Sequence, residues 1–271
     1  LSLSSCLKSF EGVICSDVAH IHIDECGAPE KFGIKLIPLK STNGKIEIES
    51  IKPYMSYIGF EHNIQPKVIS ITQCTERGTL YQLEELKIIT DYAHKNGLYV
   101  HMDGARIANA AVSLNCSLQE ITKGIDILSF GGTKNGMMYG EAVIFFNNKL
   151  AKNFKYLRKQ AMQLGSKMRY ISTQFNALLS NDLWRHNATH ANSMAKILAQ
   201  KLSQFTQIKI VNKVETNSVF AILPKDIIPK LQKHFHFYIW NEMLKEVRLM
   251  TSFDTKEEDI DDFINLIKAN I

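Results

Sequence analysis

The sequence has no apolar stretch long enough to cross a bilayer, which takes about 20 mostly apolar residues in a row. Its beginning lacks a charged segment that leads into an apolar core, so no secretory signal is predicted. The five cysteines stand singly, without a C-x-x-C pair, a pattern typical of reduced thiols in a reducing compartment. These absences together predict a cytoplasmic protein without contact to a membrane.

A basic stripe is also absent. The formal net charge of +5 is spread over the chain, and lysines and arginines do not gather with interleaved aromatic residues. The sequence therefore predicts no nucleic-acid partner.

Two groups of histidines resemble metal ligands only superficially. His186 and His190 lie four residues apart, but the glutamate that the zinc-protease pattern requires after the first histidine is missing. Residues 20–25 hold two histidines and two carboxylates, in an alternation that suits a strand turning into a loop. We therefore expect no metal site.

Short apolar runs alternate with helical patterns through the first half of the chain. Residues 84–96 carry apolar side chains on one helical face and stop before Gly97, where a C-cap glycine belongs. Near-continuous apolar strands between helices predict a mainly parallel sheet covered on both faces. The expected strands are residues 12–16, 35–39, 67–72, 98–102, 126–130 and 142–146.

The second half changes character. Residues 149–205 show no strand pattern and predict long helices with breaks near Gly165 and Asn181. The last helix is expected to begin at Thr255, with Glu258 completing a capping box. We expect a large domain over residues 1–155 and, over residues 156–271, a helical connection with a small C-terminal α/β domain. Four strands are expected in the latter, at residues 208–211, 219–223, 235–240 and 247–252.

Asp103 follows the apolar run 98–102 and leads into a helical pattern, with Arg106 close behind. In a parallel sheet, ligand-binding groups collect outside the carboxyl ends of the strands. Asp is also a frequent helix N-cap, and this segment alone favours that simpler interpretation.

Lys134 follows the next apolar run in the segment 129–136, S-F-G-G-T-K-N-G. Its two glycines let the backbone approach a ligand closely, although the P-loop spacing is absent. Adjacent βα units place Asp103 and Lys134 at the same end of one sheet. Pyridoxal phosphate requires such a pair, since a lysine forms its Schiff base and an aspartate holds its pyridine nitrogen protonated.

At these residues the chain resembles the low-specificity L-threonine aldolases. Residues 100–110, V-H-M-D-G-A-R-I-A-N-A, resemble the H-x-D-G-A-R segment of that family, and residues 129–136 resemble its lysine motif. Residues 19–30 and 248–253 resemble two further family segments, and the likeness runs over the whole chain. It implies the fold of fold-type-I pyridoxal-phosphate enzymes, a large mainly parallel sheet flanked by helices with a smaller α/β domain.

The resemblance also implies roles for individual residues. Lys134 would hold pyridoxal phosphate, Asp103 would pair with its pyridine nitrogen, and His20 would stack on its ring and serve as the candidate base. The further implied contacts are Arg106 and Arg248 with the substrate carboxylate, and Thr133 and Arg169 with the cofactor phosphate, Arg169 from a neighbouring subunit. Arg248 also suits a solvent-exposed place on a strand, and His20 a local hydrogen bond at a strand end.

The implied reaction is the cleavage of L-threonine, L-allo-threonine and related β-hydroxy-α-amino acids to glycine and an aldehyde, in a homodimer or homotetramer. Two rival hypotheses stay open. One is another lyase with the same cofactor, which would act by β-elimination. The other is an inactive, truncated remnant of a threonine aldolase.

Residues 1–10 have apolar side chains at helical spacing with no capping residue in front, so the chain is expected to open inside a helix. In the family that it resembles, a strand and a Gly-Thr-Gly loop precede that helix and hold the cofactor phosphate. The resemblance therefore implies an N-terminally truncated chain with weak retention of the cofactor. It also implies that the strand at residues 142–146 lies unpaired at a sheet edge.

Overall fold

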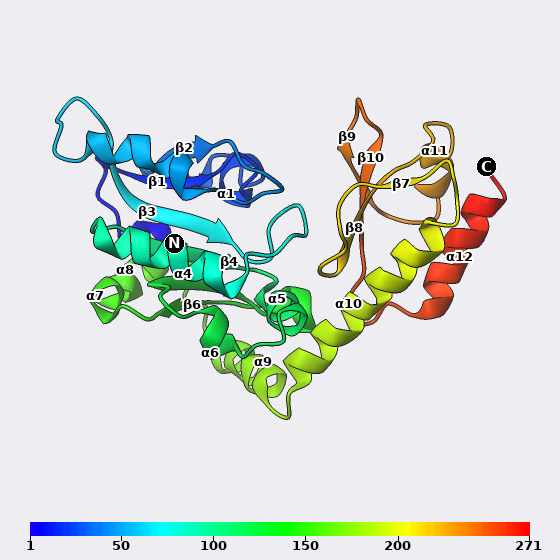
Figure 1. The fold of residues 1–271 in the computed structure, drawn as a ribbon. Coiled ribbons are helices and arrows are strands. Elements are labelled where there is room, and N and C mark those ends of the chain that lie inside the picture. Colours follow the sequence, from blue (N-terminus) through cyan, green and yellow to red (C-terminus); the bar gives the residue numbers. More distant parts are fainter.

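The computed structural model describes residues 1–271, which form two α/β units joined by one long helix (Figure 1). The large unit is built on a six-stranded sheet with the order β2-β1-β3-β4-β5-β6. All neighbours pair in parallel except β5 and β6, which are antiparallel, so β6 lies at one edge. The predicted mainly parallel sheet is confirmed. Its strands are β1 (Glu11–Ser16), β2 (Lys35–Leu39), β3 (Gln65–Thr72), β4 (Tyr99–Gly104), β5 (Ile127–Gly131) and β6 (Glu141–Phe145).

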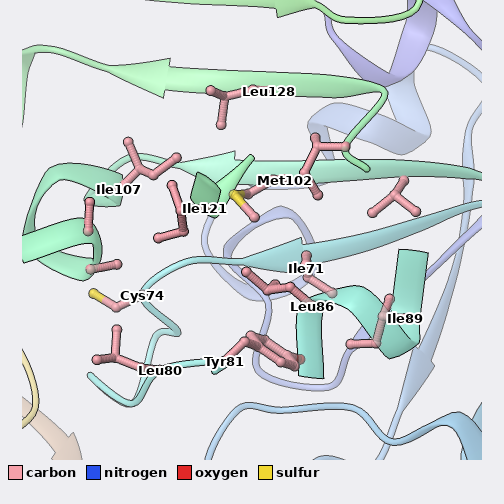
Figure 2. Packing of buried hydrophobic residues seen from close by; sticks show 14 of the residues in the cluster. Ile71, Cys74, Leu80, Tyr81, Leu86, Ile89, Met102, Ile107, Ile121 and Leu128 are labelled. Atoms are coloured by element: carbon pink, nitrogen blue, oxygen red, sulfur yellow. The ribbon is translucent and has the colours of Figure 1, made fainter. Parts of the chain in front are cut away.

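The core of the large unit lies between this sheet and its helices. Figure 2 shows Ile71, Met102 and Leu128, from three neighbouring strands, in one cluster with Leu86 and Ile89 of α4 (Leu83–Lys95). Each of these five side chains is at most 3% exposed. Removing an aliphatic side chain of this size from water stabilises the fold by about 2 kcal/mol.

Helix α4 follows the prediction to within one residue at each end. Its start is capped where the Gln82 N–H donates to the Glu85 carboxylate over 2.6 Å. Gly97 follows its end with a φ of 69°, a backbone conformation that glycine adopts without a Cβ clash.

Shorter helices and turns complete the large unit. They are α1 (His20–Ile23), α2 (Ala28–Lys31), α3 (Ile48–Ile51), α5 (Ile107–Ser113), α6 (Leu118–Ile121), α7 (Asn148–Ala151), α8 (Phe154–Gln160), α9 (Arg169–Leu179), and the 3₁₀ turns η1 (Leu3–Ser5), η2 (Lys52–Tyr57) and η3 (Thr133–Asn135). The predicted breaks near Gly165 and Asn181 are confirmed, since they separate α8, α9 and the long helix α10 (Leu183–Leu202). No helix combines the length and the apolarity that a membrane crossing requires.

The small unit is an antiparallel sheet with the order β7-β8-β10-β9 (Figure 1). Its elements are β7 (Lys209–Ile210), β8 (Ser218–Ile222), α11 (Ile228–Leu231), β9 (Tyr238–Asn241), β10 (Glu246–Met250) and α12 (Glu257–Lys268). β9 begins three residues later than predicted because Phe235 and Phe237 pack against Phe263 of α12 instead of extending the strand. The predicted capping box of α12 is shifted by one residue, since the Asp259 carboxylate accepts from the Lys256 N–H over 2.8 Å.

Helix α10 belongs to both units. Near its start, Trp184 and Ala188 lie in the core of the large unit, whereas Ala195, Leu198 and Leu202 lie in that of the small unit. The two cores therefore divide along α10, while the boundary predicted between residues 155 and 156 falls inside α8.

The prediction of a helix over residues 1–10 is wrong. Only η1 forms a helical turn there, and Phe10 is 55% exposed. Leu3 alone of the apolar residues on the expected face is buried, in a small cluster with Val13 and Val68. Ser2 is held to the sheet by its hydroxyl, which lies 3.0 Å from His101 Nε2 and 3.1 Å from the Ser129 hydroxyl.

Candidate active site

A pocket with a volume of about 1120 Å³ opens where β1, β3, β4 and β5 end. Five of the predicted site residues line it together, which are His20, Asp103, Arg106, Lys134 and Arg248. The large unit supplies the first four and the small unit supplies Arg248 from β10. The pocket therefore lies between the two units, at the carboxyl ends of parallel strands where ligands bind in such sheets.

Asp103 is the penultimate residue of β4, in register with Thr72 of β3 and Ser129 of β5. Its Oδ1 accepts from the Ala105 N–H over 2.9 Å within the turn that follows. The simpler interpretation as an N-cap is wrong, because α5 begins only at Ile107, with Arg106 at the cap position. The carboxylate thus stays in the pocket wall.

Lys134 lies in η3, three residues after β5 ends. The glycines before it serve close packing, since a Cβ on Gly131 would come within 2.7 Å of the Ala105 Cα, so the β4 and β5 ends can touch. Burial, followed by the nearby Arg106, lowers the pKa of Lys134, although Asp103 opposes the shift. A lysine with a lowered pKa is more often neutral, the form that attacks a carbonyl carbon.

His20 is the first residue of helix α1, so the prediction of a strand turning into a loop is wrong at this point. Its imidazole Nδ1 lies 3.1 Å from Glu25 Oε1, and its side chain is 47% exposed toward the pocket. The hydrogen bond with Glu25 raises the pKa of His20, against the opposing effect of burial. The same bond lowers the pKa of Glu25.

Arg248 occupies the central part of β10, paired with Phe220 of β8 and Tyr238 of β9. Its guanidinium carbon lies 5.3 Å from the ring centroid of Trp240, and its Nε is buried without a hydrogen-bond partner. Burial, with Arg106 nearby, lowers the pKa of Arg248 to about 10. The alternative of a solvent-exposed strand arginine is therefore wrong, and two guanidinium groups share one pocket.

Thr133 and Arg169 lie outside the pocket wall. The Thr133 hydroxyl accepts from the Gly140 N–H over 3.0 Å, across the turn between β5 and β6. Arg169 is exposed at the start of α9, with its guanidinium 5.2 Å from the ring centroid of Tyr170. Their predicted phosphate contacts stay predictions.

Glu76, Trp240 and His101 also line the pocket and were not assigned a role from the sequence. Glu76 follows β3, and the carboxyl end of β3 lies beside that of β4. An acidic residue shortly after a strand of the parallel sheet is therefore a signal by which Glu76 could have been found. Trp240 has no such signal, because its place depends on how the small unit meets the large one.

His101 is buried beneath the pocket, two residues before Asp103 on β4. Its Nδ1 lies 2.9 Å from the Ser70 hydroxyl, and its Nε2 lies 3.0 Å from the hydroxyls of Ser2 and Ser129. This network connects three neighbouring strands with Ser2, the residue before η1, under the pocket floor.

Comparison with known proteins identifies the family of this chain. Residues 1–226 match the family model described as beta-eliminating lyase. The chain is 42% identical to the low specificity L-threonine aldolase of Pseudomonas sp. and 41% identical to that of Pseudomonas aeruginosa. These alignments cover 99% and 96% of this chain, and 79% and 76% of the relatives. Among solved structures, a Leishmania major threonine aldolase superposes with a TM-score of 0.92 at 32% identity, over 98% of this chain and 79% of the other.

Proposed function

This chain belongs to the beta-eliminating lyase family, and on that premise we propose that it is a carbon–carbon lyase acting on β-hydroxy-α-amino acids. It cleaves L-threonine, L-allo-threonine and related compounds to glycine and an aldehyde. The observation that carries this function is the meeting of Lys134 and Asp103 with His20 and two arginines in one pocket. An amino-acid substrate needs partners for its amine, its carboxylate and its hydroxyl, and this pocket offers a group for each.

The donor set fits pyridoxal phosphate as the cofactor. Lys134, with its lowered pKa, would hold the cofactor covalently, Asp103 would hold the pyridine nitrogen, and His20 would lie against the ring. When bound, the cofactor supplies a ring that accepts the electron pair of the breaking Cα–Cβ bond. Thr133 and Arg169 are the proposed partners of its phosphate, with Arg169 reaching from a second subunit.

Arg106 and Arg248 orient the substrate. A guanidinium donates two parallel hydrogen bonds to a carboxylate, which fixes both the position and the direction of that group. The Nε of Arg248 has no hydrogen-bond partner within the protein, so this nitrogen is not committed to another protein group. Two positive charges close together in a buried pocket also favour an anion strongly.

His20 is the proposed base. With its Nδ1 bonded to Glu25, the Nε2 is left to take the proton from the substrate β-hydroxyl. As that proton leaves, the oxygen forms a carbonyl with Cβ while the Cα–Cβ bond breaks. Cα then takes up one proton, so the products are an aldehyde and glycine.

Self-association is supported by apolar side chains on one surface of the large unit. Met138 and Tyr139, in the turn between β5 and β6, are 90% and 61% exposed. This turn is held against α9, since Gln174 Oε1 accepts from the Met138 N–H over 3.0 Å, and Tyr170 of α9 is 63% exposed. A homodimer or homotetramer would cover this surface, which a monomer would leave in water.

The test is a product assay on the protein supplied with pyridoxal phosphate. We expect equal amounts of glycine and acetaldehyde from L-threonine, and a loss of more than roughly a thousandfold in kcat for Lys134→Ala. Lys149→Ala, at an exposed lysine outside the pocket, is the matched control and retains activity. Release of ammonia and a keto acid in place of glycine would instead establish β-elimination.

A further inference from the structure

Glu76 is a buried carboxyl group in the pocket wall, and the reaction proposed above gives it no task. It lies four residues beyond the end of β3, between that strand and α4, and is 7% exposed. No lysine, arginine or histidine side chain pairs with it, although Arg77 beside it is paired with Glu246. A buried carboxyl without a cation is costly unless its oxygens are otherwise satisfied.

The two oxygens of Glu76 have unequal surroundings. Oε1 accepts from the backbone N–H of His20 over 2.9 Å and from the Thr72 hydroxyl over 2.8 Å. Oε2 is buried and has no partner. Glu76 therefore ties the start of α1 to the end of β3, where Thr72 lies in register with Asp103.

Burial and hydrogen bonding act in opposite directions on the protonation of this carboxyl group. Burial raises the pKa of Glu76, the hydrogen bonds oppose the shift, and Asp103 nearby adds to it. Both hydrogen bonds of the side chain are made by Oε1. An isosteric amide would keep the accepting oxygen in the same place.

We propose that Glu76 is a positioning residue, whose carboxyl group holds the first residue of α1 in place and thereby sets where His20 lies in the pocket. His20 is the N-terminal residue of a four-residue helix, and its backbone N–H is the group that Glu76 accepts from. The inference rests on the proposed function only for the task that His20 performs.

The first test is a titration of the His20 imidazole by NMR in the protein without cofactor. The charged groups that face His20 are Glu25 of the turn after α1, Asp103 of β4 and Lys134 of η3. In Glu76→Gln we expect the pKa of His20 to stay at its wild-type value. In Glu76→Ala we expect it to fall, because α1 shifts and the hydrogen bond to Glu25 is lost. Glu246→Gln, which alters another buried carboxyl away from His20, is the control and leaves that pKa unchanged.

The second test measures activity in a double-mutant cycle. We expect kcat within about threefold of wild type for Glu76→Gln and a loss of about tenfold for Glu76→Ala. In the background of His20→Ala, adding Glu76→Ala should cost less than about twofold, because Glu76 acts through His20. If the alanine variant does not fold, it is replaced by Glu76→Asp, whose side chain is shorter by one methylene group. The same results are expected for this variant.

Two results would overturn the role of Glu76, and a third would overturn the proposed function. An unchanged pKa of His20 in Glu76→Ala would overturn the positioning role of Glu76. A loss of kcat in Glu76→Gln as large as in Glu76→Ala would also overturn it, since a group that transfers a proton cannot be replaced by an amide. Absence of glycine formation by the wild type would instead defeat the proposed function, and the titration would still decide the place of Glu76.

Discussion

The guanidinium of Arg248 lies over the indole ring of Trp240, with 5.3 Å between the guanidinium carbon and the ring centroid, and both side chains line the pocket. Phe220 meets Trp240 edge to face, with ring centroids 5.4 Å apart. The Arg77 guanidinium lies 4.6 Å from the centroid of Phe220. Two arginines and two aromatic rings thus form one cluster where the two units meet, and these contacts hold Arg248 in place.

We predict that Trp240→Leu raises the KM for the amino-acid substrate by about tenfold while kcat changes much less. The reason is that a cation–π contact in a desolvated place is worth about 1–2 kcal/mol, and without it Arg248 is free to turn away from the pocket. Steady-state kinetics with L-threonine measure the effect. Trp240→Phe, which keeps an aromatic face, is the control, and an unaltered KM in the leucine variant would show that Arg248 is held by other contacts.

The ion pair between Arg77 and Glu246 connects the same two units. Arg77 Nη2 lies 2.7 Å from Glu246 Oε1, and the side chains are 16% and 5% exposed. We predict that Glu246→Ala lowers the free energy of unfolding by about 3 kcal/mol, because it leaves a buried guanidinium without its partner. Urea unfolding measures this change.

A matched control for that pair lies on the neighbouring turn. Glu242 pairs with Lys245 over 2.9 Å, but its side chain is 70% exposed. Since exposed pairs are screened by water, Glu242→Ala should change the free energy of unfolding by less than about 0.5 kcal/mol. Equal effects of the two substitutions would contradict the role given to the buried pair.

The hydrogen bond between His20 and Glu25 gives a prediction with a defined sign. The bond raises the pKa of His20 and lowers that of Glu25. The pair therefore stabilises the fold between the lowered pKa of Glu25 and the raised pKa of His20, and this stabilisation is lost as the pH leaves that window on either side. We predict that Glu25→Gln lowers the pKa of His20, because the hydrogen bond is the largest cause of its rise. The NMR titration of His20 measures this, and a pKa that stays at the wild-type value would show another partner to be responsible.

The strands of the large sheet were predictable because their apolar runs are continuous and short, and this pattern leaves few alternatives. Residues 35–39, for instance, are both the predicted strand and the observed β2. Lys134 and Asp103 were predictable for a related reason. Their distance along the chain is one βα unit, and adjacent units place strand ends side by side.

The predictions that were wrong concern segments whose conformation depends on contacts with distant parts of the chain, which a local sequence pattern does not contain. Residues 1–10 have helical spacing, yet in the fold Ser2 bonds to His101 and Ser129, which lie more than ninety residues away along the chain. His20 opens a helix rather than ending a strand because the carboxyl of Glu76 accepts from its backbone N–H. Tertiary contacts of this kind override the local preference of a segment for helix or strand. Both examples lie at the pocket.

His101 supplies the last prediction, on acid stability. Burial lowers the pKa of His101 from 6.5 to about 4, while the same imidazole in the unfolded chain binds a proton near pH 6.5. The unfolded state therefore binds more protons than the native state across this window, so stability falls as the pH falls from about 6.5 to about 4, by roughly 3 kcal/mol in all. His101→Gln keeps hydrogen-bonding groups for the surrounding serines but does not titrate. We predict that this variant is less stable than wild type at pH 7 but loses less stability on acidification, with urea midpoints between pH 7 and about 4.5 as the measurement. Parallel pH profiles for the two proteins would contradict the prediction, since the carboxylates that also titrate in this range are common to both.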